Sequence, residues 1–182
     1  MKAAAWWTMG LVALCLFSGC GEAPVPGTGS VGFDVYVSAA AIDEIGGFQL
    51  ALVKPGVFSD CTSITETCLK NQLSSTNQLV PVKDDQGNTV PALFVPNALT
   101  TSGPVRTQDT TLRDVPAGKD YFLIVEALSR QNPPRLLGAS CTQRIEVRTG
   151  TNERVQAEPI VFFTDQGGGA DGGLGVPCDP RF

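Results

Sequence analysis

Alternation of apolar and polar side chains with a period of two is the feature that most constrains the fold of this chain. In the segments 33–37 and 48–52, every second residue is Phe, Leu or Val. Successive side chains of a β-strand point to opposite faces of a sheet, so this period indicates strands with one buried face. Both segments are therefore predicted to be strands of a sheet with a packed side.

Other segments carry the same signal in weaker or stronger form. Residues 80–83 and 89–95 flank the polar turn 84–88, which predicts two strands joined by a tight connection. Proline lacks the N–H that a central strand needs, so Pro81, Pro91 and Pro96 favour edge positions. The remaining predicted strands are 106–115, 135–141, 144–148 and 154–163.

The segment 120–130 is the most apolar part of the body. Both of its faces carry large apolar side chains, and only Glu126 interrupts them. A strand that is buried on both faces lies in the middle of a layered structure, so this segment is predicted to be a central strand.

Helical signals are scarce and short, covering 39–44 and 62–72. Seven or eight short strands separated by turn signals predict an all-β fold, a two-layer antiparallel β-sandwich of prealbumin-like or immunoglobulin-like type. A doubly wound α/β fold needs helices that this sequence lacks.

The N-terminal segment has the pattern of an export signal. Lys2 precedes an apolar run over 3–17, which is shorter than the ~20 residues of a membrane-spanning helix. Residues 17–20, Phe-Ser-Gly-Cys, resemble the lipobox of bacterial lipoproteins, although Phe17 stands where that family prefers Leu. The resemblance implies a cleaved signal helix over 1–19 and a Cys20 that carries the lipid, including palmitate. Ordinary secretion with a free Cys20 thiol and a retained membrane helix are the alternatives.

The remaining chain divides by composition into three parts. Residues 20–30, rich in Gly and Pro, are predicted to be the lipidated Cys and a flexible tether, 31–163 the sandwich, and 164–182 a Gly-rich tail. Gly21 after the lipidated Cys, by resemblance to lipoprotein sorting in enteric bacteria, implies the outer membrane. Attachment by two or three acyl chains is effectively permanent.

The cysteines are expected to form two disulfides. Of the six, Cys15 leaves with the signal and Cys20 is acylated, which leaves Cys61, Cys68, Cys141 and Cys178. An even number in an exported chain favours disulfides over thiols, and three pairings are possible. Nearness in sequence favours Cys61 with Cys68 and Cys141 with Cys178, the second bridge pinning the tail to the body. The Cys-x6-Cys spacing is too wide for a zinc knuckle.

A turn motif carries a second resemblance. Residues 112–123 are similar to the strand, Pro-x-Gly turn and aromatic-started strand of prealbumin-like and carboxypeptidase-regulatory-like sandwiches. Pro116 presets the turn, Gly118 is expected to supply a positive φ, and Tyr121 begins a buried strand. The lipobox, acidic sandwich and late 138–141 segment (Gly-Ala-Ser-Cys) also resemble short envelope lipoproteins of gliding Gram-negative bacteria, which implies envelope location and protein contacts.

Composition excludes several classes of function. The chain has no His, so Ser-His-Asp and Cys-His catalysis and His-ligated zinc are impossible. Its 13 basic and 18 acidic residues give a net charge of −5, the wrong sign for binding nucleic acid. No cofactor motif is present, and the chain is expected not to be an enzyme.

Acidic side chains are the remaining candidates for metal binding or acid–base catalysis. The turn 84–88 could offer oxygens to Ca²⁺, but it supplies too few ligands, so no metal site is expected. The Gly/Asp segment 167–173 occurs only once and is expected to be a linker. Asp43 with Glu44, and Asp109 with Asp114, are expected to be exposed charges. An enzyme would instead bury Asp109 or Asp114 near Glu126.

These observations favour a membrane-anchored, non-enzymatic lipoprotein that binds another envelope protein, within a trans-envelope assembly such as a gliding-motility or export machine. A sheet edge or the loop 60–78 would carry the contact. A lipoprotein that binds a small molecule or polysaccharide is the alternative, and it requires a concave apolar pocket with a few polar groups.

Overall fold

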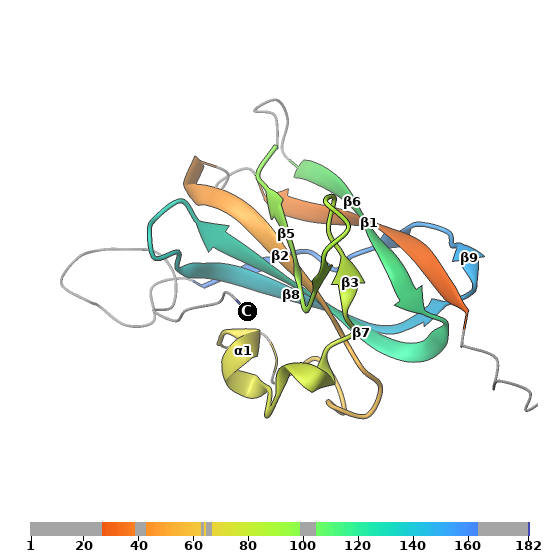
Figure 1. The fold of residues 1–182 in the computed structure, drawn as a ribbon. Helices are drawn as coiled ribbons and strands as arrows, with labels where there is room; N and C mark the ends of the chain where they lie inside the picture. Colours follow the sequence, from red (N-terminus) through yellow and green to blue (C-terminus); the bar gives the residue numbers. More distant parts are fainter. Residues whose placement is uncertain (1–26, 39–42, 63, 65–66, 99–104, 164–181) are drawn as a thin grey trace, which may run out of the picture.

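The computed structural model describes residues 27–38, 43–62, 64, 67–98, 105–163 and 182, and these form two packed β-sheets (Figure 1). The predicted all-β, two-layer fold is confirmed. The predicted signal helix over 1–19, Cys20 and the tether up to residue 26 lie outside the described residues. No helix among the described residues has the length and apolar character needed to cross a membrane.

The strands divide unequally between the two sheets. The six-stranded sheet has the order β10 (Val155–Gln156), β1 (Thr28–Ser38), β6 (Val105–Pro116), β3 (Val82–Lys83) and β4 (Thr89–Val90), with β9 (Gly150–Thr151) also paired to β1. The five-stranded sheet has the order β11 (Val161–Phe162), β8 (Leu136–Val147), β7 (Gly118–Ser129), β2 (Ile45–Val53) and β5 (Leu93–Pro96). The short helices are α1 (Leu69–Gln72) and the 3₁₀ turn η2 (Thr76–Gln78).

The strand count and pairing differ from the prediction in detail. The described residues contain eleven strands rather than seven or eight. The predicted strands 89–95 and 154–163 are each split in two, 135–141 and 144–148 form the single strand β8, and the short β9 is additional. The predicted strand 89–95 is split at Pro91 into β4 and β5, which belong to different sheets. β9 and β10 run parallel to β1, so the arrangement is not purely antiparallel.

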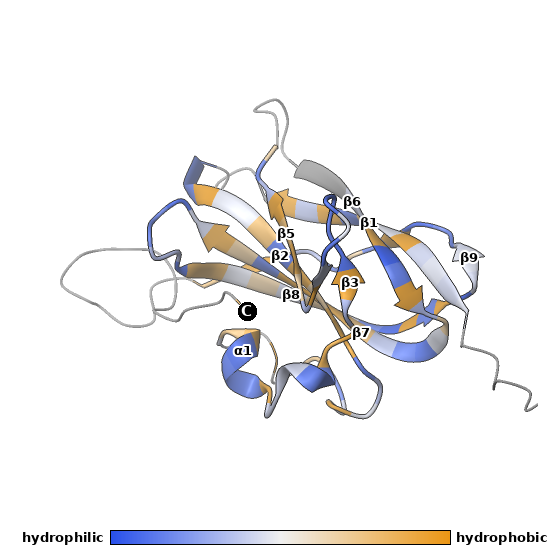
Figure 2. Cartoon of the chain, in the orientation of Figure 1, coloured by the Kyte–Doolittle hydropathy of each residue, from blue (hydrophilic) through white to orange (hydrophobic). Residues whose placement is uncertain are grey.

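The main core lies between the sheets and is built from the alternating residues of the sequence pattern. Phe33, Val35, Phe48, Leu50 and Leu52 are all at most 1% exposed and belong to one cluster. Figure 2 shows the matching alternation of apolar and polar residues along these strands. Full burial of each Phe or Leu contributes about 1.5–3 kcal/mol, so this layer supplies most of the driving force for folding.

Strand β7 is central, as predicted. It pairs with β2 on one side and β8 on the other. Leu123 and Val125 point into the main core, whereas Phe122 and Ile124 belong to a cluster on the outer face of the sheet. Burial of both faces requires a second covering layer, and the segment 54–80 provides it.

The hairpin between β6 and β7 contains the predicted turn motif. The Tyr121 hydroxyl donates to the Pro116 carbonyl at 3.0 Å. Gly118 does not adopt a positive φ; Asp114 and Asp120 do, at 58° and 60°. Space favours glycine at 118, since a Cβ there would lie 2.7 Å from the Tyr121 hydroxyl oxygen and would displace the Tyr121 side chain.

Candidate binding groove

The segment 54–80, here called the outer loop, packs onto the outer face of the five-stranded sheet (Figure 1). At its base, the Lys54 N–H donates to the Gln78 carbonyl at 2.9 Å and the Val80 N–H to the Leu52 carbonyl at 2.7 Å. A buried apolar cluster, here called the outer cluster, joins loop and sheet: Ala51, Val53, Ile64, Leu69, Leu79, Phe122, Ile124 and Cys141. The buried apolar residues of the loop therefore pack against its own sheet.

A disulfide fastens this loop to strand β8. Cys61 is bonded to Cys141, with a Cα–Cα distance of 5.6 Å across 80 residues of sequence. Both pairings that nearness favoured, Cys61 with Cys68 and Cys141 with Cys178, are therefore wrong. Because the outer loop folds back over β7 and β8, tertiary packing brings a distant cysteine closer than the neighbouring one.

Cys68 is also one half of a disulfide, and it is fully buried at the start of α1. It packs with Leu128 and Leu136, next to the partly buried Phe163. Its bonding partner lies outside the described residues, as does Cys178.

Glu126 is buried beneath the outer loop. It is 1% exposed, on the outer face of β7. One carboxyl oxygen, Oε1, accepts the Leu69 N–H at 2.8 Å, and the other, Oε2, accepts the Gln49 side-chain N–H at 2.8 Å. Glu126 thus connects the first residue of α1 with a side chain of β2.

The environment of Glu126 shifts its protonation. Burial raises the pKa of its carboxyl group to about 7, and the hydrogen bonds from Leu69 and Gln49 offset only part of that increase. A perturbed carboxyl group is a frequent mark of a functional site. Its hydrogen-bond partners are a backbone N–H and a side-chain amide.

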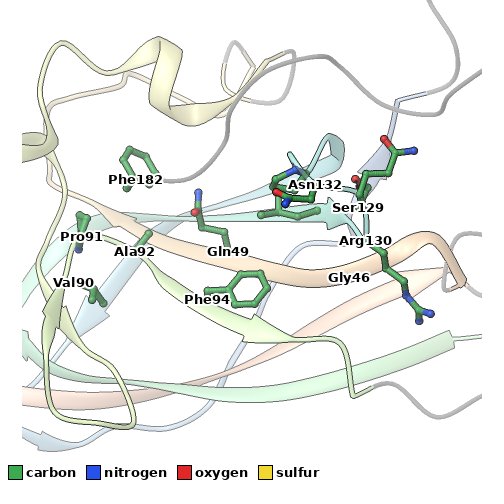
Figure 3. A pocket seen from close by; sticks show the side chains of 13 residues that line it. Gly46, Gln49, Val90, Pro91, Ala92, Phe94, Ser129, Arg130, Asn132 and Phe182 are labelled. Carbon is green, nitrogen blue, oxygen red and sulfur yellow. Dashed lines mark hydrogen bonds between the residues drawn. The ribbon is translucent and has the colours of Figure 1, made fainter. Parts of the chain in front are cut away.

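A groove of about 580 Å³ lies beside β5, next to the outer loop, and is called here the β5 groove. Gln49 lies in its middle, between an apolar end and a polar end (Figure 3). The apolar end is formed by Val90, Pro91, Ala92, Phe94 and Phe182.

The polar end is formed by the connection between β7 and β8, with Ser129, Arg130, Gln131 and Asn132. The Arg130 Nε–H donates to the Ile45 carbonyl at 3.1 Å, and Figure 3 shows its side chain pointing away from the middle of the groove. The polar groups that face the groove are thus neutral amides and a hydroxyl. This lining suits a neutral ligand with both apolar and hydrogen-bonding parts.

The groove adjoins an edge strand of the five-stranded sheet. β5 is the last strand of its sheet and pairs only with β2 among the described strands. Phe94 lies on it with 53% of its surface exposed, one of two large apolar side chains described as exposed; the other is Val161, at 65%, on the opposite edge strand β11. An exposed aromatic beside a groove is typical of a contact surface.

The carboxylates singled out in the sequence do not gather at the groove. Asp84 closes its own turn: its carboxylate accepts the Asn88 side-chain N–H at 3.0 Å and the Asn88 backbone N–H at 2.7 Å. The side-chain hydrogen bond is the main reason that the pKa of Asp84 lies below its usual value. Asp43, Glu44 and Asp114 are exposed, and the Asp109 side chain is not described. Within the described residues, no three acidic, Cys or His side chains are grouped to hold a metal ion.

Sequence reasoning missed the residues that shape the groove. The one available signal was Phe94, an aromatic residue in a strand that Pro91 and Pro96 already placed at an edge. Glu126 stood out in the sequence as the polar interruption of a segment with two apolar faces, but Gln49 gave no signal, because their meeting depends on the register of β2 against β7, in which they are direct partners.

Comparisons with protein-family models, with curated proteins and with solved structures found no match for this chain. The groove and its surroundings are therefore interpreted from their own chemistry.

Proposed function

We propose that this protein is a lipid-anchored, non-enzymatic lipoprotein of the outer membrane that binds an extended segment of another envelope protein in the β5 groove. The observation that carries the proposal is the position of this groove, beside the edge strand β5 with the exposed Phe94. An extended segment can pair with a strand edge while it places side chains in adjacent pockets.

Anchoring rests on the sequence. Residues 17–20 resemble a lipobox ending in Cys20, and β1 begins at Thr28, seven residues after Gly21. So short a connection reaches at most ~25 Å, which would hold the sandwich close to the membrane surface. The turn at Pro116 and Gly118 supports a prealbumin-like sandwich, and a gliding-motility or export assembly is the setting that resemblance suggests.

The lining of the groove favours a peptide as its ligand. An extended backbone presents alternating N–H and C=O groups, and each carboxamide side chain offers both a donor and an acceptor. Gln131 and Asn132 supply two such groups without charge. The apolar end would hold one large side chain of the partner, and such a buried anchor provides most of the binding energy at typical interfaces.

Site-specific photo-crosslinking in membranes of the native host tests the proposal. A photoreactive amino acid at position 94 is expected to form an adduct with one protein partner. The matched control places the same group at Val161, which is equally apolar and exposed but lies on the other edge of the sheet. Equal labelling from both positions, or no protein adduct at position 94, would argue against the groove as a partner site.

A small molecule or glycan is the second candidate ligand. The volume of the groove and its two phenyl rings, Phe94 and Phe182, favour it. In that case position 94 would yield only adducts of low mass, and native mass spectrometry of detergent-purified protein would show a bound compound that Phe94→Ser removes.

A further inference from the structure

Phe182 differs from the other residues that line the β5 groove. All of the others belong to strands of the two sheets or to the turns that directly join these strands. Phe182 instead follows the segment 164–181 and belongs to no strand. Figure 3 shows its ring at the apolar end of the groove, the end that also holds Pro91 and Ala92.

Apolar packing holds the Phe182 ring in this place. The residue is half-buried and packs against the outer cluster. Within the described part of the chain, Phe182 takes part in no hydrogen bond, ion pair or strand pairing. Hydrophobic attraction has no preferred direction, so a ring held in this way can be exchanged for another apolar group of similar size.

The covalent attachment of the chain next to Phe182 keeps the ring close to the groove. Cys68 is disulfide-bonded to a cysteine outside the described residues, and Cys178 is the expected partner. Leu128 packs against Cys68 and also lines the groove, which places this bond beside the groove. From residue 178 to residue 182 the chain reaches at most ~14 Å. A group tethered so closely has an effective concentration on the order of millimolar.

We propose that Phe182 is an internal ligand of the β5 groove: it occupies the place that a large side chain of the partner takes, and the partner must displace it to bind. The apolar end then has two alternative occupants, one from this chain and one from the partner. This inference concerns the regulation of the proposed binding site and rests on the proposed function.

Competition of this kind lowers the apparent affinity for a partner. A half-buried phenylalanine contributes about half of what a fully buried one does, which corresponds to about 3- to 12-fold in binding. Removal of the Phe182 ring should therefore strengthen binding at the apolar end by this factor. A residue that only forms the wall of a pocket has the opposite effect, because its removal takes contact area away from the ligand.

Photoaffinity labelling of the full-length, detergent-purified protein in its oxidised form tests the inference. The probe is N-acetyl-4-benzoylphenylalanine amide, a neutral photoreactive analogue of phenylalanine, and mass spectrometry measures its attachment to residues 90–96. The concentration for half-maximal labelling should fall about 3- to 12-fold in Phe182→Ala. Phe182→Leu keeps an apolar group at this position and should fall between Phe182→Ala and the wild type.

The matched control is Phe58→Ala. Phe58 is also a half-buried phenylalanine packed against the outer cluster, but it does not line the groove. Its variant should label at the same concentration as the wild type, and excess N-acetylphenylalanine amide, unlike N-acetylalanine amide, should suppress labelling in every variant.

Four results would overturn the inference. Weaker labelling of Phe182→Ala would make Phe182 a wall of the groove, and unchanged labelling would show that its ring does not occupy the contested place. An equal gain in Phe58→Ala would indicate a general loosening of the outer cluster. Absence of labelling in all variants would show that the apolar end does not accept a phenyl group. The probe replaces the natural partner, which photo-crosslinking at position 94 requires, so failure of this inference and failure of the proposed function are distinguishable.

Discussion

Cys61 and Cys141 form a disulfide that joins the outer loop to strand β8 across 80 residues of sequence. Bonded there, the loop covers the outer cluster and the buried Glu126. Together, loop and disulfide convert the outer face of a two-layer sandwich into a third packed region, at whose margin the β5 groove lies.

Loss of this disulfide is expected to destabilise the protein substantially. Closing a loop of 80 residues corresponds to about 4.5 kcal/mol in the chain-entropy treatment. Cys61→Ser together with Cys141→Ser should lower the urea midpoint accordingly. Peptide mapping of the oxidised wild type should recover a 61–141 crosslink, and recovery of a 61–68 crosslink would contradict the structure.

Cys178 is the expected partner of Cys68. Cys68 is disulfide-bonded, and Phe182, four residues beyond Cys178, packs against the outer cluster near α1. Cys178→Ser should therefore expose one additional thiol, at residue 68, when the denatured protein is alkylated and mapped by mass spectrometry. An unmodified Cys68 in that variant would assign its bond to another cysteine.

Stability should fall as the pH rises from about 4.5 to 7. The pKa of Glu126 is raised from 4.5 to about 7 on folding, so within this window the folded protein keeps a proton that the unfolded chain releases. At 1.36 kcal/mol per pKa unit, the loss approaches about 3 kcal/mol. Urea unfolding measures the free energy of unfolding of the wild type and of Glu126→Gln. The difference between the two should depend on pH only between about 4.5 and 7.

Gly118 and Tyr121 should prove energetically coupled. A Cβ at position 118 meets the Tyr121 hydroxyl oxygen at 2.7 Å, so Gly118→Ala is expected to cost about 1–3 kcal/mol. Tyr121→Phe removes the hydrogen bond to the Pro116 carbonyl, at about 1 kcal/mol. The phenylalanine also removes the clashing hydroxyl oxygen, so the double variant should lose less stability than the two single variants lose together. Chemical denaturation measures the free energy of unfolding of each variant, and strictly additive losses would refute the packing role of Gly118.

Membrane attachment is expected to depend on Cys20. Without a thiol at this position no diacylglyceryl group can be added, so Cys20→Ala should move the protein from the membrane to the soluble fraction. Fractionation followed by immunoblotting measures the change. Unchanged recovery with membranes would contradict acylation.

Local patterns in the sequence determined the secondary structure well. The alternation in 33–37 and 48–52 corresponds to β1 and β2, and the two-sided apolar segment 120–130 to the central β7. These predictions succeed because the side-chain period of a strand and the burial of its faces are properties of neighbouring residues. The absence of His and the lipobox-like residues 17–20 can likewise be recognised without knowing the fold.

Only the tertiary structure decided the site. The bond between Cys61 and Cys141 joins residues 80 positions apart, and the hydrogen bonds that Glu126 accepts from Gln49 and Leu69 join residues 77 and 57 positions apart. Sequence distance favoured Cys61 with Cys68, but the packing of the outer loop over β7 and β8 outweighed it. Glu126 shows the reason most directly: its place in a strand follows from its neighbours, whereas its raised pKa exists only because a distant segment covers it and excludes water.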